Sequence, residues 1–244
     1  MLKKGKNLRV EKLDSCLGRQ GKGIDLGILF FGEKFENRHE WEQFKEIRYS
    51  LINQYEKKDE MVYVFFNLYL SDQQGRSQID VAIFTKDGPM IIELKSYKGI
   101  VTGNESAEWK VKTPETEVKV DENVYRQLER QKFALIRKLD AFRTQELIAA
   151  DKTFFFVKCC AYFQKGSSYD PYQISFKDKK WFSVITIDDL IEEIGFINSS
   201  RRWSIREMDV IAKAIGLPKY PPPEKPIELK MWLKALDSYV YPLI

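Results

Sequence analysis

The chain has 244 residues, a formal net charge of +4 at pH 7, 43% hydrophobic residues and 31% charged residues. This length suits one substantial domain with an appendage or two small domains, with enough apolar residues to bury a core. The single histidine, His39, excludes a zinc site built from several histidines. A catalytic metal would therefore be held by carboxylate and carbonyl oxygens, which favours Mg²⁺ or Mn²⁺.

Cysteine usage and hydropathy predict a cytoplasmic protein. The chain has three cysteines, and two of them, Cys159 and Cys160, are adjacent, so they do not form a disulfide framework. The basic N-terminus is not followed by an apolar signal region. No apolar run approaches the ~20 residues of a membrane span, so no membrane association is expected.

The first half of the chain predicts a helix followed by an antiparallel meander. Residues 18–23 are rich in glycine and basic, but their spacing does not match a phosphate-binding loop. Apolar residues at three- and four-residue steps predict a helix over residues 37–55. Stretches rich in β-branched and aromatic residues, separated by turn sequences, predict strands at residues 61–70, 79–85 and 90–95. Residues 26–31 form either a further short strand or the approach to the helix.

The second half alternates again between helix and strand. The predicted elements are a long helix over 123–142 with an apolar stripe that includes Phe133, a buried strand over 154–163, a strand over 181–187 and a helix over 188–194. Beyond them, Ser204 and Gly216 bound a capped helix, residues 219–226 are rich in proline and are expected to be irregular, and residues 228–239 form a last amphipathic helix. The order predicts an α/β fold with a mixed sheet flanked by helices. The expected division is an arm at 1–31, a core domain at 32–195 and a helical extension at 196–244.

Three charged residues on two neighbouring strands are the candidate catalytic group. Glu93 and Lys95 are two residues apart on one strand and therefore point to the same face, while Asp80 begins the strand before it. Two carboxylates can hold Mg²⁺ beside a scissile phosphate, and the lysine can position or help to deprotonate the attacking water. Leu94 points away, but its carbonyl can face the site. Taken alone, such a trio is often a solvent-facing row with cross-strand ion pairs.

The residues around this trio resemble a known family. QIDVAIF at residues 78–84 and DGPMIIELKSYKG at residues 87–99 resemble the NERD (nuclease-related) domain, a branch of the PD-(D/E)XK nuclease superfamily. GEKFE at residues 32–36 and NVYRQ at residues 123–127 resemble two further motifs of that family, and Gly103 and Trp109 follow at similar distances. Phe35 stands where the family usually has glycine, and Val124 where it usually has proline.

The resemblance implies an αβββαβ core of the restriction-endonuclease type and a set of site residues. It implies Asp80, Glu93 and the Leu94 carbonyl as ligands of Mg²⁺ or Mn²⁺, with Lys95 beside them. Glu36 is favoured as a third acid from the first helix, with Glu40 as the alternative. Gln127 would reach into the site from the following helix. Three basic residues are candidates for contacts with backbone phosphates: Lys98, Arg126 and Arg130.

Two functions follow from these features. The leading hypothesis is a Mg²⁺-dependent nuclease that hydrolyses phosphodiester bonds in DNA, with RNA left open as a substrate. The alternative is a module that binds nucleic acid or recruits a partner such as a helicase, as a subunit of a DNA repair or antiphage defence complex that is active only with its partner. The sequence leaves the oligomeric state open.

Overall fold

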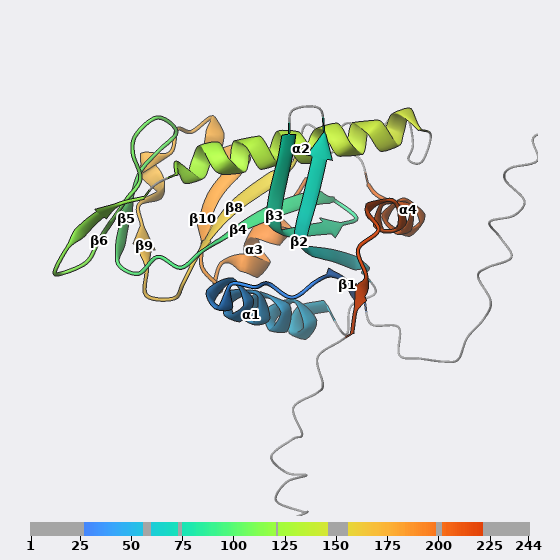
Figure 1. Ribbon diagram of the computed structural model, residues 1–244, viewed down its shortest axis with the longest axis horizontal. Helices are drawn as coiled ribbons and strands as arrows, with labels where there is room; N and C mark the ends of the chain where they lie inside the picture. Colours follow the sequence, from blue (N-terminus) through green and yellow to red (C-terminus); the bar gives the residue numbers. More distant parts are fainter. Residues whose placement is uncertain are drawn as a thin grey trace, which may run out of the picture.

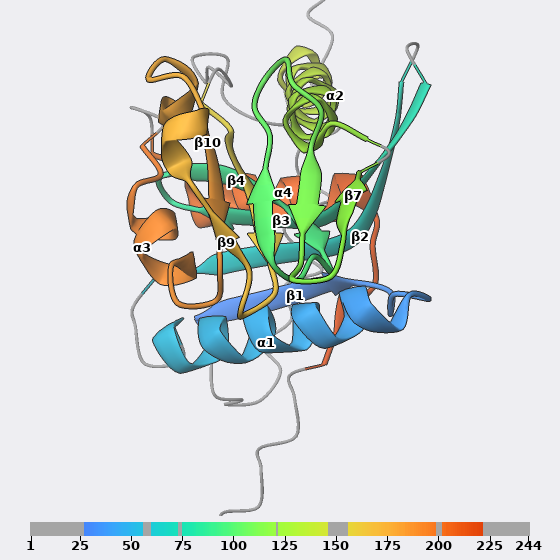
Figure 2. The same ribbon diagram turned by 90° about the vertical axis from the view of Figure 1, so that its left-hand side faces the viewer.

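The computed structural model describes residues 27–55, 60–72, 75–120, 122–145, 156–198 and 202–221. In this part of the chain a central sheet lies between two layers of helices, and a smaller sheet projects from one end (Figure 1, Figure 2). The structure therefore confirms a mixed α/β architecture. The predicted helix at 228–239 and the glycine-rich stretch at 18–23 lie outside the described residues.

The central sheet has seven strands in the order β10-β8-β4-β3-β2-β1-β11. Strands β2, β3 and β4 form the predicted antiparallel meander, whereas β8 runs parallel to both β4 and β10, and β1 runs parallel to β2. Parallel neighbours need a crossover connection, which the long helix between β4 and β8 provides. The strands are β1 (Ile28–Gly32), β2 (Val62–Asp72), β3 (Gly75–Thr85), β4 (Gly88–Lys95), β8 (Lys158–Phe163), β10 (Phe182–Ile185) and β11 (Lys219–Tyr220).

Four helices cover the two faces of this sheet. On one face lie α1 (Arg38–Tyr55) and the short α3 (Leu190–Gly195); on the other lie α2 (Val124–Thr144) and α4 (Ile205–Ile215). The two apolar cores that result are separated by the sheet. Because α1 and α2 lie on opposite faces, a site that both helices reach must lie where the sheet opens.

The two long helices show the apolar periodicity that the sequence predicts, and α2 also has an N-terminal capping residue. In α1, buried residues recur at helical spacing from Gln43 and Phe44 to Leu51 and Tyr55. In α2, Asn123 caps the N-terminus, since its side chain accepts a hydrogen bond from the Arg126 backbone N–H. These helices begin and end within two residues of the predicted bounds.

The smaller sheet has the order β7-β6-β5-β9 and consists of very short strands. Its strands are β5 (Ile100–Thr102), β6 (Lys110–Lys112), β7 (Glu117–Lys119) and β9 (Ser168–Tyr169), and the 3₁₀ helices Pro171–Gln173 and Asp178–Lys180 follow β9. Trp109 is fully buried at its base and stacks on Tyr169 with ring centroids 5.3 Å apart. Trp109 therefore packs the small sheet against the rest of the domain.

The described part of the tail packs on the central domain. Ser204 and Glu207 form a capping box at the start of α4, and Gly216 ends the helix in the left-handed conformation, as predicted. Met208 and Ile211 bury the apolar face of α4 in the same core as α2. The expectation of irregular structure from residue 219 onward was wrong at its start, because β11 pairs antiparallel with β1.

Two further expectations need correction. Phe133 was assigned to the apolar stripe of the long helix, but 50% of its surface is exposed. The strand predicted over 154–163 begins only at Lys158, since residues 156 and 157 lie outside it and residues 154 and 155 are not described. No helix in the described ranges is both long and apolar enough to cross a membrane.

Candidate active site

The site lies where β3 and β4 separate. Their antiparallel ladder ends at the pair Val81–Ile92, and the next residue on each strand is acidic, Asp80 on β3 and Glu93 on β4. Beyond this point β3 continues into the hairpin with β2, whereas β4 stays beside β8. The two carboxylates thus lie at the mouth of a gap between strands.

Asn67 shapes the β3 side of this gap. In the register of β2 with β3, Asn67 lies opposite Asp80, and its φ is +51°, a left-handed conformation that asparagine tolerates better than most residues. The residues on either side of Asp80 pack into different cores: Val81 belongs to the core under α1, whereas Ile79 belongs to the core under α2. The twist places Asp80 at the boundary between the two cores.

Asp80 is buried and accepts a hydrogen bond from the β4 backbone. Only 6% of Asp80 is exposed, and its Oδ2 accepts from the Leu94 backbone N–H at 2.8 Å. In an antiparallel pair, the N–H and C=O of one residue point to the same neighbouring strand, so the Leu94 carbonyl is directed into the same gap. Burial, followed by the negative charge of Glu93, raises the pKa of Asp80 well above its usual range.

Glu93 is the hub of a buried polar network. Only 4% of Glu93 is exposed, and its Oε1 accepts from Lys95 Nζ at 2.9 Å and from Gln127 Nε2 at 2.6 Å. Its Oε2 accepts from Gln131 Nε2 at 2.6 Å. Lys95 Nζ also donates to Gln127 Oε1 at 2.8 Å, so each of Glu93, Lys95 and Gln127 is hydrogen-bonded to the other two. Each buried polar group is held in one orientation by the others.

The surroundings of Lys95 favour its ammonium form. Burial disfavours the ammonium, but the charge and hydrogen bond of Glu93, together with Tyr97 and Asp80, offset this, and the pKa of Lys95 is raised above its usual value. The ammonium form donates hydrogen bonds and carries positive charge.

The long helix α2 supplies two glutamines from one face. Gln127 and Gln131 are four residues apart and therefore lie one above the other. Gln127 was a sequence candidate, but Gln131 was missed. Gln131 is 3% exposed, its Nε2 also donates to the Gln78 carbonyl at 2.9 Å, and its Oε1 is buried with no hydrogen-bond partner among the described residues. The signal that could have found it is the four-residue step from Gln127.

The first helix, α1, supplies Glu40 and Gln43. The Glu40 carboxyl interacts electrostatically with Glu93, Lys95 and Asp80; burial and then the charge of Glu93 raise its pKa. Gln43, which sequence reasoning missed, lies three residues on and donates to the Lys95 carbonyl at 2.9 Å. Its Oε1 is also buried, and no residue in the described part of the chain forms a hydrogen bond with it.

The structure separates the two candidates for the helical acid. Glu36, the favoured residue, is exposed in the bend before α1. Glu40, the alternative, accepts a hydrogen bond from the Asn37 side chain at 2.9 Å and interacts with the acids of the gap. Glu40 is therefore the helical acid that the fold brings to the other site residues.

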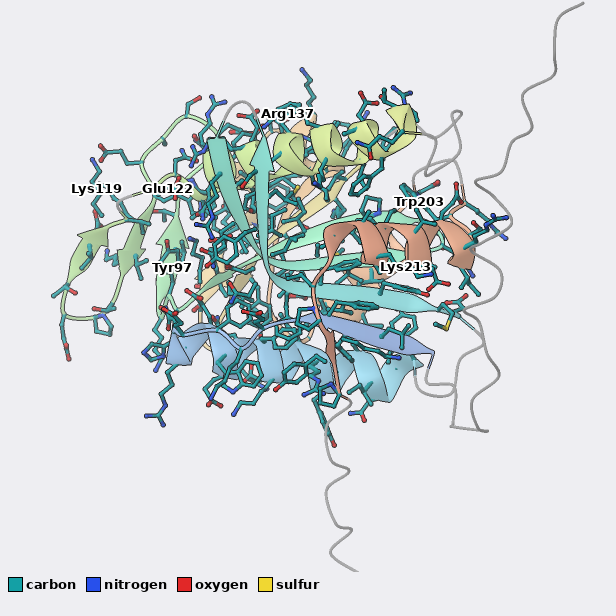
Figure 3. The ribbon with its side chains drawn as sticks, turned by 45° about the vertical axis from the view of Figure 1, so that its right-hand side comes forward. Tyr97, Lys119, Glu122, Arg137, Trp203 and Lys213 are labelled. Carbon is teal, nitrogen blue, oxygen red and sulfur yellow. The ribbon has the colours of Figure 1, made fainter. Side chains whose placement is uncertain are left out.

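The predicted phosphate contacts lie around the site rather than in it. Lys98 lines a groove of about 480 Å³ that begins at Lys95 and runs over the small sheet. Arg126 pairs with Glu129 at 2.9 Å on the exposed side of α2. Arg130 pairs with Glu122, which lines the same groove as Lys98. Figure 3 shows Tyr97, Lys119 and Glu122 on this end of the molecule.

The donor set fits a hard divalent cation. Asp80, Glu93 and the Leu94 carbonyl are oxygen donors, and Mg²⁺ is commonly bound by one or two carboxylates with water completing its shell. Cys159 and Cys160 are buried on β8, and burial raises the pKa of both thiols, so they are poor candidates for ligands. In the described ranges, no cluster of three or more Asp, Glu, His or Cys side chains is arranged to hold a metal. A metal here would rely on two carboxylates, a carbonyl and water.

The structure thus combines a mixed α/β domain with paired acids and a lysine at the opening of its central sheet. Comparison with known families identifies the group. The model of the NERD (nuclease-related) domain matches residues 38–163, just over half of the chain, and the chain therefore belongs to this family. The matched segment runs from the start of α1 to the end of β8 and contains the whole polar network. No curated protein and no solved structure matches the chain.

Proposed function

We propose that this chain is a metal-dependent nuclease that hydrolyses phosphodiester bonds in DNA, with a core of the PD-(D/E)XK type. The observation that carries the proposal is the convergence of Asp80, Glu93 and Lys95 at the gap between β3 and β4. Buried charges of this kind are costly to keep for stability alone, and they are common where chemistry requires them. Membership of a nuclease-related family supports the same reaction class.

Asp80, Glu93 and the Leu94 carbonyl would hold Mg²⁺ or Mn²⁺, and Glu40 would be the acid from the first helix. When bound, such a cation neutralises charge on the scissile phosphate and lowers the pKa of water. Burial and then repulsion by Glu93 raise the pKa values of Asp80 and Glu40, and a cation between the acids would relieve that repulsion.

The other residues would orient the substrate and the acids. The raised pKa of Lys95 favours its ammonium form, which would donate to a phosphate oxygen or fix the attacking water. Gln127 contacts both Lys95 and Glu93 and would keep the ammonium beside the carboxylate. Gln131 fixes the second oxygen of Glu93 and would limit rotation of that carboxylate.

One observation favours a second candidate function. Both Glu93 oxygens already accept hydrogen bonds from Lys95, Gln127 and Gln131, which compete with a metal for this carboxylate. A partner or bound DNA that shifts these donors would open the carboxylate to a metal. This favours a subunit of a repair or defence complex, active only with a partner such as a helicase, or a module that binds nucleic acid.

The test is a cleavage assay on labelled single-stranded and duplex DNA with Mg²⁺ or Mn²⁺. Wild type is compared with Asp80→Asn, Lys95→Met and the control Glu192→Gln, an exposed acid on α3. Cleavage by wild type and by the control, with loss in the other two variants, supports the proposal. Cleavage of equal rate in all four proteins contradicts it, and silence in all four with retained DNA binding favours the second function.

A further inference from the structure

A hollow of about 240 Å³ lies beside the site, between the β2–β3 hairpin and α2. One wall is the start of β3, Gly75–Ser77, and the other is one face of α2 with Arg130, Phe133, Ala134 and Arg137. Figure 2 shows the hairpin rising alongside α2, and Figure 3 shows Arg137 on this helix near the hairpin. The hollow is separate from the groove that begins at Lys95.

Phe133 is the unusual residue of this hollow. A single exposed aromatic side chain needs no explanation by itself. Phe133, however, is half exposed on the wall of a concave site, and arginines lie on the same helix face three residues before it and four residues after it. An aromatic ring between cationic side chains is the arrangement that binds the bases and phosphates of a single strand.

Arg130, one turn before Phe133, can exchange its present partner for a phosphate. Arg130 pairs with Glu122, but both side chains are largely solvent-exposed, and such pairs contribute little to stability. A phosphate group offers guanidinium a stronger, charge-assisted partner. Arg76, on the opposite wall of the hollow, lies over the Tyr69 ring at 4.2 Å and adds a further positive charge.

The hollow adjoins the catalytic network. Gln131 donates both to Glu93 and to the Gln78 carbonyl, and Gln78 directly follows the wall residue Ser77. Along α2, Phe133 lies six residues beyond Gln127, a rise of about 9 Å at 1.5 Å per residue, and is turned about 120° around the helix axis from it. The Arg130–Glu122 pair also joins this hollow to the groove at Lys95. A strand that passes Lys95 can therefore reach Phe133 within a few nucleotides.

We propose that Phe133, flanked by Arg130 and Arg137, is a stacking site for an unpaired base of single-stranded DNA within a few nucleotides of the scissile phosphate. A duplex buries the faces of its bases, so only an unpaired base can lie on the ring. The inference rests on the proposed nuclease function for the position of the scissile phosphate, and it adds a preference for single-stranded substrate and the residue that determines it.

The test is equilibrium binding of a short oligonucleotide that contains the fluorescent base 2-aminopurine, measured with the full chain and chelator so that no turnover occurs. The variants are Phe133→Ala, Phe133→Trp and, as a matched control, Phe196→Ala, an exposed aromatic residue next to α3 on the opposite face of the sheet. Phe133→Ala should weaken binding of the single strand about tenfold and relieve the quenching of 2-aminopurine on binding. Phe133→Trp and Phe196→Ala should bind like wild type.

Three results would overturn the inference: unchanged single-strand binding in Phe133→Ala, an equal loss for a blunt duplex, or an equal loss in Phe196→Ala. Hydrolysis of the small substrate bis(4-nitrophenyl) phosphate separates this failure from failure of the proposed function. If wild type and Phe133→Ala both hydrolyse it but bind DNA alike, only the stacking site is wrong. If neither hydrolyses it while Phe133→Ala alone loses single-strand binding, the stacking site stands and the nuclease assignment is wrong.

Discussion

Removal of the Lys95 ammonium should lower the free energy of unfolding, because it leaves the buried Glu93 carboxylate without its ion-pair partner. Loss of one partner from a fully buried ion pair costs about 3–5 kcal/mol, because the other charge stays buried and unpaired. In Lys95→Met, Glu93 would keep its hydrogen bonds from Gln127 and Gln131, and 18% of the lysine side chain is exposed. Both features reduce the cost, so we expect a loss of about 2–3 kcal/mol at pH 7.

Urea denaturation of the full chain measures this loss. The control is Lys213→Met on the exposed side of α4, where we expect a change within about 0.5 kcal/mol. The double variant Lys95→Met/Glu93→Gln should recover part of the lost stability, because the unpaired charge is gone. A loss no larger than that of the control, or a double variant less stable than Lys95→Met, would refute the view that the pair is electrostatically coupled in a buried site.

Further predictions concern the acids and the small sheet. Asp80→Asn should stabilise the protein at neutral pH, because the pKa of Asp80 is raised in the fold. Wild type therefore loses stability as the pH rises from about 4 through that raised pKa. Between pH 4 and 8, the free energy of unfolding should depend less on pH in the variant than in wild type. Glu40→Gln should reduce metal-dependent cleavage at least tenfold, whereas Glu36→Gln should leave the rate within about twofold of wild type; the reverse order would restore the assignment made from the sequence. Gly103→Ala should lower the melting temperature, because an added Cβ would lie 2.5 Å from the Trp109 ring at a φ of +153°; unchanged calorimetry would contradict this packing.

The elements that carry the polar trio could be predicted from local sequence. The alternation of β4 places Glu93 and Lys95 on one face whatever surrounds the strand, and their contact at 2.9 Å follows from it. The helix periodicity of α1 and α2 and the capping residues Ser204 and Gly216 are equally local signals.

The remaining features depend on packing between distant segments. Glu36 and Glu40 are only four residues apart in the sequence, and the position of α1 against the sheet determines which of them meets Glu93. The exposure of Phe133 depends in the same way on where the hairpin passes α2. The pairing of β11 with β1 joins segments almost 190 residues apart and includes only two residues of β11, too few for a sequence pattern.

The central claim is that Glu93, held by Lys95 and two glutamines of α2, is part of a metal-dependent nuclease site. The most direct measurement is the initial rate of DNA cleavage by wild type and Glu93→Gln, purified side by side and assayed with Mg²⁺ and with chelator. We predict cleavage by wild type that needs Mg²⁺ and falls by at least a hundredfold in Glu93→Gln. Equal rates in the two proteins, or cleavage that chelator leaves unchanged, would contradict the account.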